Sequence, residues 1–419
     1  MKSFLPILFL CLNTAFCSGA QDLQEIYEAG LQAYKQKEYA MFLKHMQQAD
    51  SLRSGHPVIL QNLAKAQALN QLPEKAIKTL NGVIYMNANI DLQDEDFSSL
   101  REKASYKELL AQANLLKASV QKSKVFIELA DKTLHPEGMA FHKESGSFYV
   151  GSVHQRKILK IDADKQVSVF YEGNALFAIM GMAVDQQRDL LWVCSTAVPQ
   201  MQGYTEALAG KAAVLCFDIA TKELLGTFPV EDSAAWLGDL AIAPNGTVYS
   251  TSGSTAHPAI YKVNRAKEIT EEWLYLDELI SLQGISFKPN GEQFYITDYR
   301  YGLFLVDVKS KSLKKLTNET LHPLKGIDGL YFYHNHLIAI CNGLQPYQVV
   351  QFQLNEQGNS ITNLEYLDKA LPEMNEPTLG VISQDELYYI ANSPWSAYSG
   401  NMQQIPEKLQ QPLILKIKL

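Results

Sequence analysis

The chain has 419 residues, enough for two or three domains or for one large β-domain with an attachment. Hydrophobic residues make up 47% and charged residues 20%, an ordinary globular composition that excludes a wholly disordered chain. The net charge of −8 argues against a nucleic-acid or anionic-membrane surface, because either would need an excess of Lys and Arg.

The first twenty residues have the pattern of a secretory signal. Lys2 gives a positive start, residues 4–10 form a short apolar run, and residues 18–20 (Ser-Gly-Ala) are small, as a cleavage site requires. This predicts residues 1–20 as a signal peptide and an exported, periplasmic or extracellular protein. Cys17 raises the alternative of a lipoprotein, which bulky Phe16 disfavours. No other run is apolar enough for a transmembrane segment.

Residues 21–120 read as a helical segment, because they are rich in Ala, Leu, Gln, Lys and Glu and carry few strand signals. The segment repeats itself at 34 residues: Gly30 matches Ala64, and Met46 matches Leu80. This period resembles tetratricopeptide repeats, whose stacked helices often bind partner peptides. A helical cap or dimer arm with no ligand is the alternative, and the sequence leaves both open.

A different pattern recurs six times in residues 121–419. A small or polar residue starts each copy of a four-residue motif, at Gly138, Gly181, Asp239, Gly284, Gly329 and Thr378. About ten residues later each motif is followed by a second apolar run, with turn residues between. Short antiparallel strands repeated every 40–60 residues are typical of propeller blades, so we predict a mainly β fold: a six-bladed β-propeller behind the helical segment.

The sequence also predicts how the ring closes. The sixth blade ends at residues 413–419, which supply only its third strand. Residues 124–129 precede the first motif with no other partner. We therefore expect these two segments to pair in one sheet, which would hide two strand edges.

The residues just before the motifs should surround the mouth of the central channel, because each first strand is innermost and runs away from that face. They are Glu137, Met180, Gly238, Gln283, Asp328 and Pro377. A carboxylate facing a narrow channel is costly unless it is paired, solvated or bound to a cation.

The motifs His135–Phe141 (HPEGMAF) and Gly326–Phe332 (GIDGLYF) resemble those of the gluconolactonase, regucalcin and paraoxonase group, to which strictosidine synthase-like propellers are related. The resemblance implies a divalent cation, calcium by preference, held at the channel mouth, where it polarises a lactone or ester carbonyl. It assigns metal ligands at Glu137 and Asp328. Gln283 replaces an expected Asn, and Gly238 replaces another, for which Asp239 could compensate.

A second ring should come from the ends of the second strands and from the loops beyond them. Converging polar and aromatic groups are typical of a ligand pocket. We expect its substrate contacts at Ser152, Asp298, Asn342, Asn392, Tyr299 and Trp395. His154 is the candidate general base, because an imidazole titrates near neutral pH; an exposed loop histidine is the plainer interpretation. Two long loops, 196–210 and 393–411, could cover the mouth.

Two functions remain open from the sequence. One is a metal-dependent lactone or ester hydrolase acting on a small molecule. The other is a non-enzymatic ligand- or protein-binding propeller whose helical segment docks a partner. The Glu137 and Asp328 pair favours the first, and Gly238 favours the second.

Overall fold

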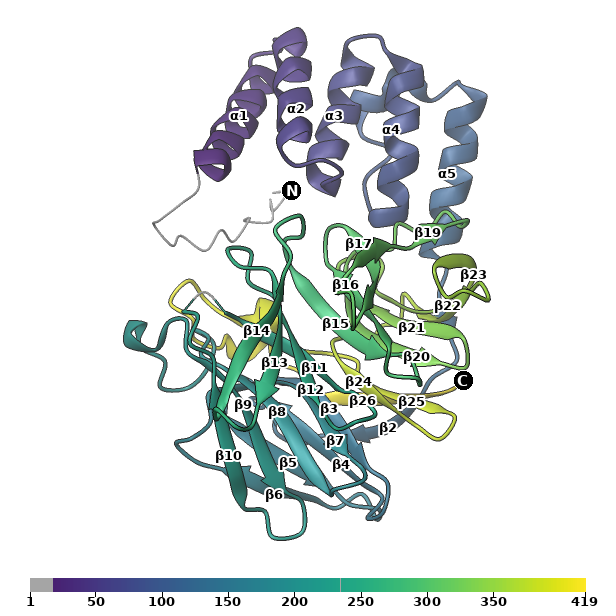
Figure 1. Ribbon diagram of the computed structural model, residues 1–419. Helices are drawn as coiled ribbons and strands as arrows, with labels where there is room; N and C mark the ends of the chain where they lie inside the picture. The colour runs from purple at the N-terminus through teal and green to yellow at the C-terminus, as the bar shows by residue number, and fades with distance from the viewer. Residues whose placement is uncertain (1–17, 234) are drawn as a thin grey trace. The chain divides into compact units, whose positions relative to one another are not determined.

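The computed structural model describes residues 18–233 and 235–419. The chain divides into two compact units, Met1–Leu115 and Leu116–Leu419, so the division falls inside the last long helix. The helices of the first unit and the strands of the second are drawn in Figure 1. All but the last three residues of the predicted signal segment lie outside the described residues. None of the described helices combines the length and hydropathy that crossing a bilayer requires.

The first unit is built from antiparallel helices with short turns. They are α1 (Ser18–Lys35), α2 (Tyr39–Leu52), α3 (Pro57–Leu69), α4 (Pro73–Met86), the 3-10 turn η1 (Glu95–Leu100) and α5 (Ala104–Lys117). Proline is the first residue of both α3 and α4, a position where its missing N–H costs nothing. The helices α2 and α4 begin 34 residues apart and have equal length, which confirms the predicted period.

The repeated small residues, Gly30 and Ala64, lie where helices pack closely, as expected. A Cβ on Gly30 would lie only 2.3 Å from Cε of Met46, so α1 and α2 approach closely at this point. The equivalent residues of the next repeat, Ala64 and Leu80, are both fully buried. The 34-residue shift therefore relates positions with the same structural environment.

The second unit is a six-bladed propeller, as predicted. Blades 1 to 3 are successive four-stranded antiparallel sheets. Their strands are β3 (Pro136–His142), β4 (Ser147–Ser152), β5 (Lys157–Ile161) and β6 (Val167–Glu172); β7 (Ala178–Asp185), β8 (Leu190–Thr196), β9 (Ala212–Asp218) and β10 (Leu224–Pro229); β11 (Leu237–Ile242), β12 (Val248–Ser252), β13 (Ala259–Asn264) and β14 (Ile269–Tyr275).

Blades 4 and 5 follow the same order, and blade 5 gains two short strands at its outer edge. Their strands are β15 (Leu282–Phe287), β16 (Gln293–Asp298), β17 (Gly302–Asp307) and β18 (Leu313–Lys315); β20 (Ile327–Tyr333), β21 (His336–Cys341), β22 (Gln348–Leu354) and β23 (Ser360–Lys369), with β1 (Val120–Gln121) and β19 (Thr317–Asn318) added. Strand β1, which begins three residues after the end of α5, extends blade 5.

Blade 6 joins the two ends of the propeller, which confirms the predicted closure. It contains β24 (Gly380–Ser383), β25 (Glu386–Ile390), β26 (Leu413–Lys418) and β2 (Lys124–Glu128). Ile414 of β26 lies opposite Ile390 of β25 on one side and Ile127 of β2 on the other. The sheet thus pairs segments almost 290 residues apart and leaves neither end of the ring open.

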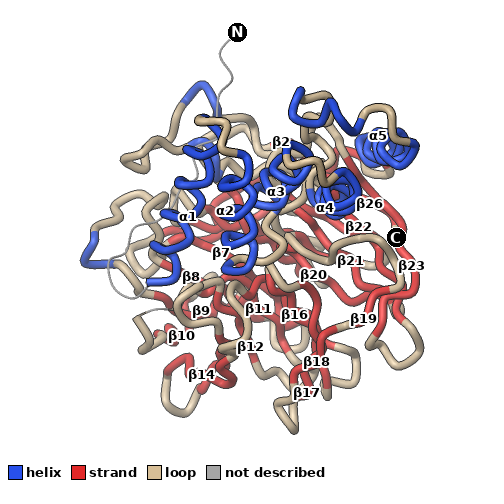
Figure 2. Tube along the Cα trace, turned by 90° about the horizontal axis from the view of Figure 1, so that it is seen from above, coloured by secondary structure: helices blue, strands red, loops and turns tan. Residues whose placement is uncertain are grey.

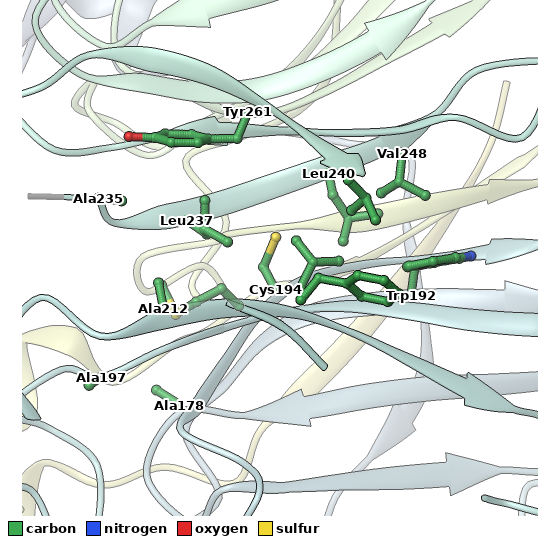
Figure 3. Packing of buried hydrophobic residues seen from close by; sticks show 14 of the residues in the cluster. Ala178, Trp192, Cys194, Ala197, Ala212, Ala235, Leu237, Leu240, Val248 and Tyr261 are labelled. Atoms are coloured by element: carbon green, nitrogen blue, oxygen red, sulfur yellow. The ribbon is translucent and has the colours of Figure 1, made fainter. Parts of the chain in front are cut away.

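The hydrophobic core of the propeller lies between neighbouring blades. Figure 2 shows its strands in red, and Figure 3 shows the cluster between blades 2 and 3. That cluster contains Trp192 and Cys194 from β8 packed against Leu237 and Leu240 from β11. Because the blade faces are held by apolar side chains, the polar residues at the strand ends are left available on the two faces of the ring.

Candidate functional site

The first residue of each motif brings neighbouring inner strands together around the channel. A Cβ on Gly138 would lie 2.0 Å from the carbonyl oxygen of Met180 in the next blade, and one on Gly181 would lie 2.6 Å from the Cα of Asp239. A larger side chain could not fit at these two positions, since the clash is with backbone. The motif therefore starts with a small residue because the inner strands nearly touch.

Two blades replace this glycine with a residue that forms a hydrogen bond to the next blade. The hydroxyl of Thr378 donates to the backbone oxygen of Glu137 at 3.0 Å, which links blade 6 to blade 1. The carboxylate of Asp239 accepts from the amide of Leu240 at 2.8 Å and from that of Ile285 in blade 4 at 3.4 Å. Both oxygens of Asp239, a candidate ligand in the sequence, thus accept backbone hydrogen bonds, and Oδ2 joins blade 3 to blade 4.

Glu137 is almost fully buried at the start of blade 1, with 7% of its surface exposed. One carboxylate oxygen, Oε2, accepts from the indole N–H of Trp395 at 2.8 Å and from the hydroxyl of Ser393 at 3.2 Å. Burial raises the pKa of Glu137 well above its ordinary value, and the nearby charge of Asp328 raises it further. The second oxygen, Oε1, accepts no hydrogen bond from the described residues.

Asp328 starts blade 5 and is held by a chain of side chains. Its Oδ2 accepts from the amide of Asn342 at 2.7 Å, and Asn342 in turn accepts from the hydroxyl of Tyr299 at 2.8 Å. Burial raises the pKa of Asp328 to about 7, and the charge of Glu376 adds to the effect. Asn342 and Tyr299, expected as substrate contacts, therefore orient the Asp328 carboxylate.

Glu376 is a third carboxylate of this site, and sequence reasoning missed it. It precedes Pro377 with a positive φ of 54°, and its Oε2 accepts from the amide of Ser396 at 2.9 Å. Burial raises its pKa. Blade 6 offers only Pro377 at the position before the motif, so the residue one step earlier supplies the carboxylate; the Glu-Pro pair was the available signal.

Gln283, in blade 4, contributes an amide to the same ring. Its Nε2 donates to the hydroxyl of Ser281 at 3.0 Å, which directs Oε1 away from that contact. A Cβ on Gly238, in blade 3, would lie 3.7 Å from Oε1. The glycine thus leaves room beside the Gln283 oxygen, and no described residue donates a hydrogen bond to that oxygen.

Three other predicted pocket residues use their polar atoms to hold loops. Ser152 is fully buried and donates to the backbone oxygen of Leu134. Asp298 is also fully buried and accepts from four backbone amides, those of residues 280, 281, 300 and 301. Asn392 bonds the backbone of Gln411 and Leu413. These contacts fix the loop geometry around the mouth.

Two histidines of blade 1 meet the ring of Tyr398. His154 is half-buried, and its Nδ1 donates to the carbonyl of Gln200 at 2.7 Å, so its Nε2 carries a lone pair in the neutral ring. His135 is fully buried, and its Nδ1 bonds the hydroxyl of Tyr398 at 2.7 Å. Burial holds the pKa of His135 well below its ordinary value, and His154 lowers it further.

Both long loops predicted to cover the mouth contact this group. The first, residues 196–210, meets His154 through Gln200 and Gln202. The second, residues 393–411, supplies Trp395 to Glu137 and Tyr398 to His135, and the rings of Trp395 and His135 meet edge to face at 4.6 Å. The loops therefore join blade 1 at the mouth.

The mouth holds one buried carboxyl group, Glu137, and two half-buried ones, Asp328 and Glu376, without a basic partner among the described residues. No lysine or arginine in the described part of the chain forms an ion pair with Glu137, Asp328 or Glu376, and none contributes to their pKa shifts. Such a group stays protonated or recruits a cation.

The carboxylates alone do not form a complete metal cage. Among the described residues, three acidic or histidine ligand atoms within 4.8 Å of one another occur only at His142, Glu144 and Asp189, in the turns on the opposite face. There His142 already bonds Ser145 at 2.9 Å and Asp189 at 3.1 Å. A cation at the mouth would therefore need amide or water oxygens beside the carboxylates.

Comparisons with known proteins give distant structural resemblances alone. No protein-family model matches the chain, and no curated protein does. Solved structures that resemble it include a gluconolactonase from Xanthomonas campestris, with 14% identity over 72% of this chain and 98% of that one and a TM-score of 0.46. A virginiamycin B lyase from Staphylococcus aureus has 11% identity over 71% and 99%, with a TM-score of 0.45. A nidogen/laminin complex has 13% identity over 55% and 79%, with a TM-score of 0.41.

A gluconolactonase and a lyase are thus among the structures similar to this chain. Identities this low concern the fold alone, and propellers with the same fold have unrelated functions. The function must be argued from the site.

Proposed function

We propose that the channel mouth binds a divalent cation, calcium by preference, and that the loaded site hydrolyses a lactone or ester. Glu137 and Asp328 would hold the cation together with the amide oxygen of Gln283. The observation that carries the proposal is the group of one buried and two half-buried carboxylates with raised pKa values and no basic partner among the described residues. A bound cation would remove the cost of burying these charges.

The available atoms fit a hard cation. Three oxygens accept no hydrogen bond from the described residues: Glu137 Oε1, Asp328 Oδ1 and Gln283 Oε1. The other polar atom of each side chain is already bonded, Glu137 Oε2 to Trp395, Asp328 Oδ2 to Asn342 and Gln283 Nε2 to Ser281. Carboxylate and amide oxygens suit calcium or magnesium better than zinc. The donor set is therefore consistent with the proposed cation.

The protein side chains would do the remaining work. When bound, the cation would polarise a substrate carbonyl. The Nε2 of His154 is the atom suited to accept a proton from water, because Nδ1 is committed to Gln200. The loop 393–411, fixed through Trp395 and Tyr398, would limit the access of bulk water.

The rival proposal is a binding propeller without catalysis. It is favoured by the hydrogen bonds that Trp395 and Asn342 make to the carboxylates, because these bonds hold the two carboxylates in place without a cation. In this case the helical unit would dock a protein partner. Export, which the first twenty residues suggest, belongs to both proposals.

Calcium titration of chelator-treated protein tests the cation. Calorimetry should give one saturable site in the wild-type protein, and Asp328→Asn should weaken it at least tenfold, because a charged ligand becomes neutral. Asp277→Asn removes an exposed carboxylate from a connection between blades and should leave the affinity unchanged. Absence of calcium binding in the wild-type protein would favour the rival.

Hydrolysis of a δ-lactone and of a nitrophenyl ester, with calcium and with chelator, tests the reaction. His154→Gln should keep calcium binding and lower kcat by about 10²-fold or more. If calcium binds but neither substrate is hydrolysed, the proposed cation site is supported and the hydrolase proposal fails for these substrates.

A further inference from the structure

A pocket lies on the face of the propeller opposite the mouth, between blades 2 and 3. It has a volume of about 280 Å³ and is lined by Arg188, Asn245, Gly246, Thr247, Val248, Val263 and Arg265. These residues come from the turns after β7, β11 and β13, which end on that face, and from the adjoining ends of β12 and β13. This volume is just below the range of about 300–1,000 Å³ that is usual for ligand pockets, so a small ligand fits it best.

The polar lining consists mainly of hydrogen-bond donors. Arg188 extends over the Asn245–Gly246 turn, with Nη1 only 2.4 Å from the place where a Gly246 Cβ would lie. The Oδ1 of Asn245 accepts from the amide of Thr247 at 2.9 Å, which leaves the Asn245 amide N–H₂ as a donor. No carboxylate lines the pocket, in a chain whose net charge is −8.

The two arginines differ in their partners. Arg188 bonds Asp185 at 2.8 Å, so part of its charge is compensated. Arg265 forms no ion pair with any described carboxylate; its guanidinium lies over the ring of Trp192, 4.8 Å from the centroid. Stacking uses the face of the guanidinium and leaves its N–H edge available, the geometry that recognises oxyanions.

Trp192 supports the guanidinium of Arg265 through its ring face. The side chain is 1% exposed, and its indole N–H has no hydrogen-bond partner among the described residues. Figure 3 shows this nitrogen at the outer end of the ring, away from Cys194 and Leu237. The ring gives Arg265 a fixed apolar support, while Trp192 itself is not among the residues that line the pocket.

From this arrangement we infer that the pocket binds the phosphate group of a small molecule. Arg265 and Arg188 would contact the phosphate oxygens, with the Asn245 amide beside them, and Val248 and Val263 would form an apolar floor. The site is independent of the proposed cation at the mouth, because the two lie on opposite faces of the ring.

Calorimetry with inorganic phosphate tests the inference, in calcium-free buffer with ionic strength held constant by sodium chloride. Wild-type protein should bind one phosphate, and Arg265→Gln should weaken binding at least tenfold. Arg265→Lys keeps the charge but loses the planar guanidinium, and it should give an intermediate loss. Lys267→Gln removes a charge from the same turn outside the pocket and should bind as the wild type does.

Thermal unfolding of each variant shows whether it is folded. If Arg265→Gln does not fold, Arg188→Gln takes its place with the same expected loss. The inference would be overturned if Arg265→Gln and Arg188→Gln bound phosphate as tightly as the wild type does. It would also be overturned if phosphate gave the wild-type protein no larger heat of binding than chloride does. Asp328→Asn, at the mouth, should bind phosphate normally whatever its affinity for calcium.

Discussion

Asp239 illustrates how one residue departs from a repeat for a physical reason. Four other blades have glycine at this position and Thr378 fills the sixth, yet Asp239 is buried and accepts two backbone hydrogen bonds. The sequence shows the departure but not its purpose, because Ile285, the partner in the next blade, is 46 residues away. The ligand role considered for Asp239 and its bridging role could be separated only with the fold in hand.

The pH dependence of stability should reveal this carboxyl group. Burial raises the pKa of Asp239 from 3.8 to about 7, so between these values the folded protein holds a proton that the unfolded chain has lost. The contribution of Asp239 to the free energy of unfolding therefore falls as pH rises through that window. Asp239→Asn cannot titrate, so relative to wild type it should be more stable at about pH 8 than at about pH 5.

Urea denaturation in the presence of a chelator measures the difference. The same stability difference at both pH values would show that Asp239 does not hold its proton in the folded state.

The residues of the candidate site could be predicted only in part. Glu137, Asp328 and Gln283 follow from their place before a motif. Trp395 was expected near the mouth, but its bond to Glu137 joins residues 258 positions apart. Glu376 was missed because Pro377 holds the expected position in blade 6. A repeat pattern does not predict which side chains from different blades will be hydrogen-bonded to each other.

At the scale of elements, the glycine of the inner strand is a packing requirement. Gly138→Ala should destabilise the propeller by about 3 kcal/mol or more, because its Cβ would lie 2.0 Å from the backbone oxygen of Met180. Gly82→Ala is the matched control: it lies in α4, has nothing within 4 Å, and should stabilise the protein by about 0.5–1 kcal/mol. Chemical denaturation measures both, and equal effects would contradict the account of the motif.

The closing strand gives a second test at this scale. Ile414 is 1% exposed and packs between blades 6 and 1, so Ile414→Ala should cost about 2–4 kcal/mol in the free energy of unfolding. Lys418→Ala, at the exposed end of the same strand, should change it by less than about 0.5 kcal/mol. A small loss for Ile414→Ala would mean that blade 6 does not hold the ring together.

At the scale of the whole molecule, the sequence was informative because its units repeat. Six motifs and a 34-residue helical period predicted both architectures, and the unpaired segments at residues 124–129 and 413–419 predicted the closure. Chemistry was less predictable, since the mouth depends on six blades each contributing one or two residues. The proposed cation and phosphate sites lie on opposite faces of the ring.

A crystal structure of the protein grown with calcium tests the central claim most directly. We predict an anomalous peak at the channel mouth with oxygens of Glu137, Gln283 and Asp328 at about 2.3–2.6 Å. A mouth that holds only water in such crystals, with Glu137 and Asp328 still bonded to Trp395 and Asn342 alone, would contradict the proposed cation site.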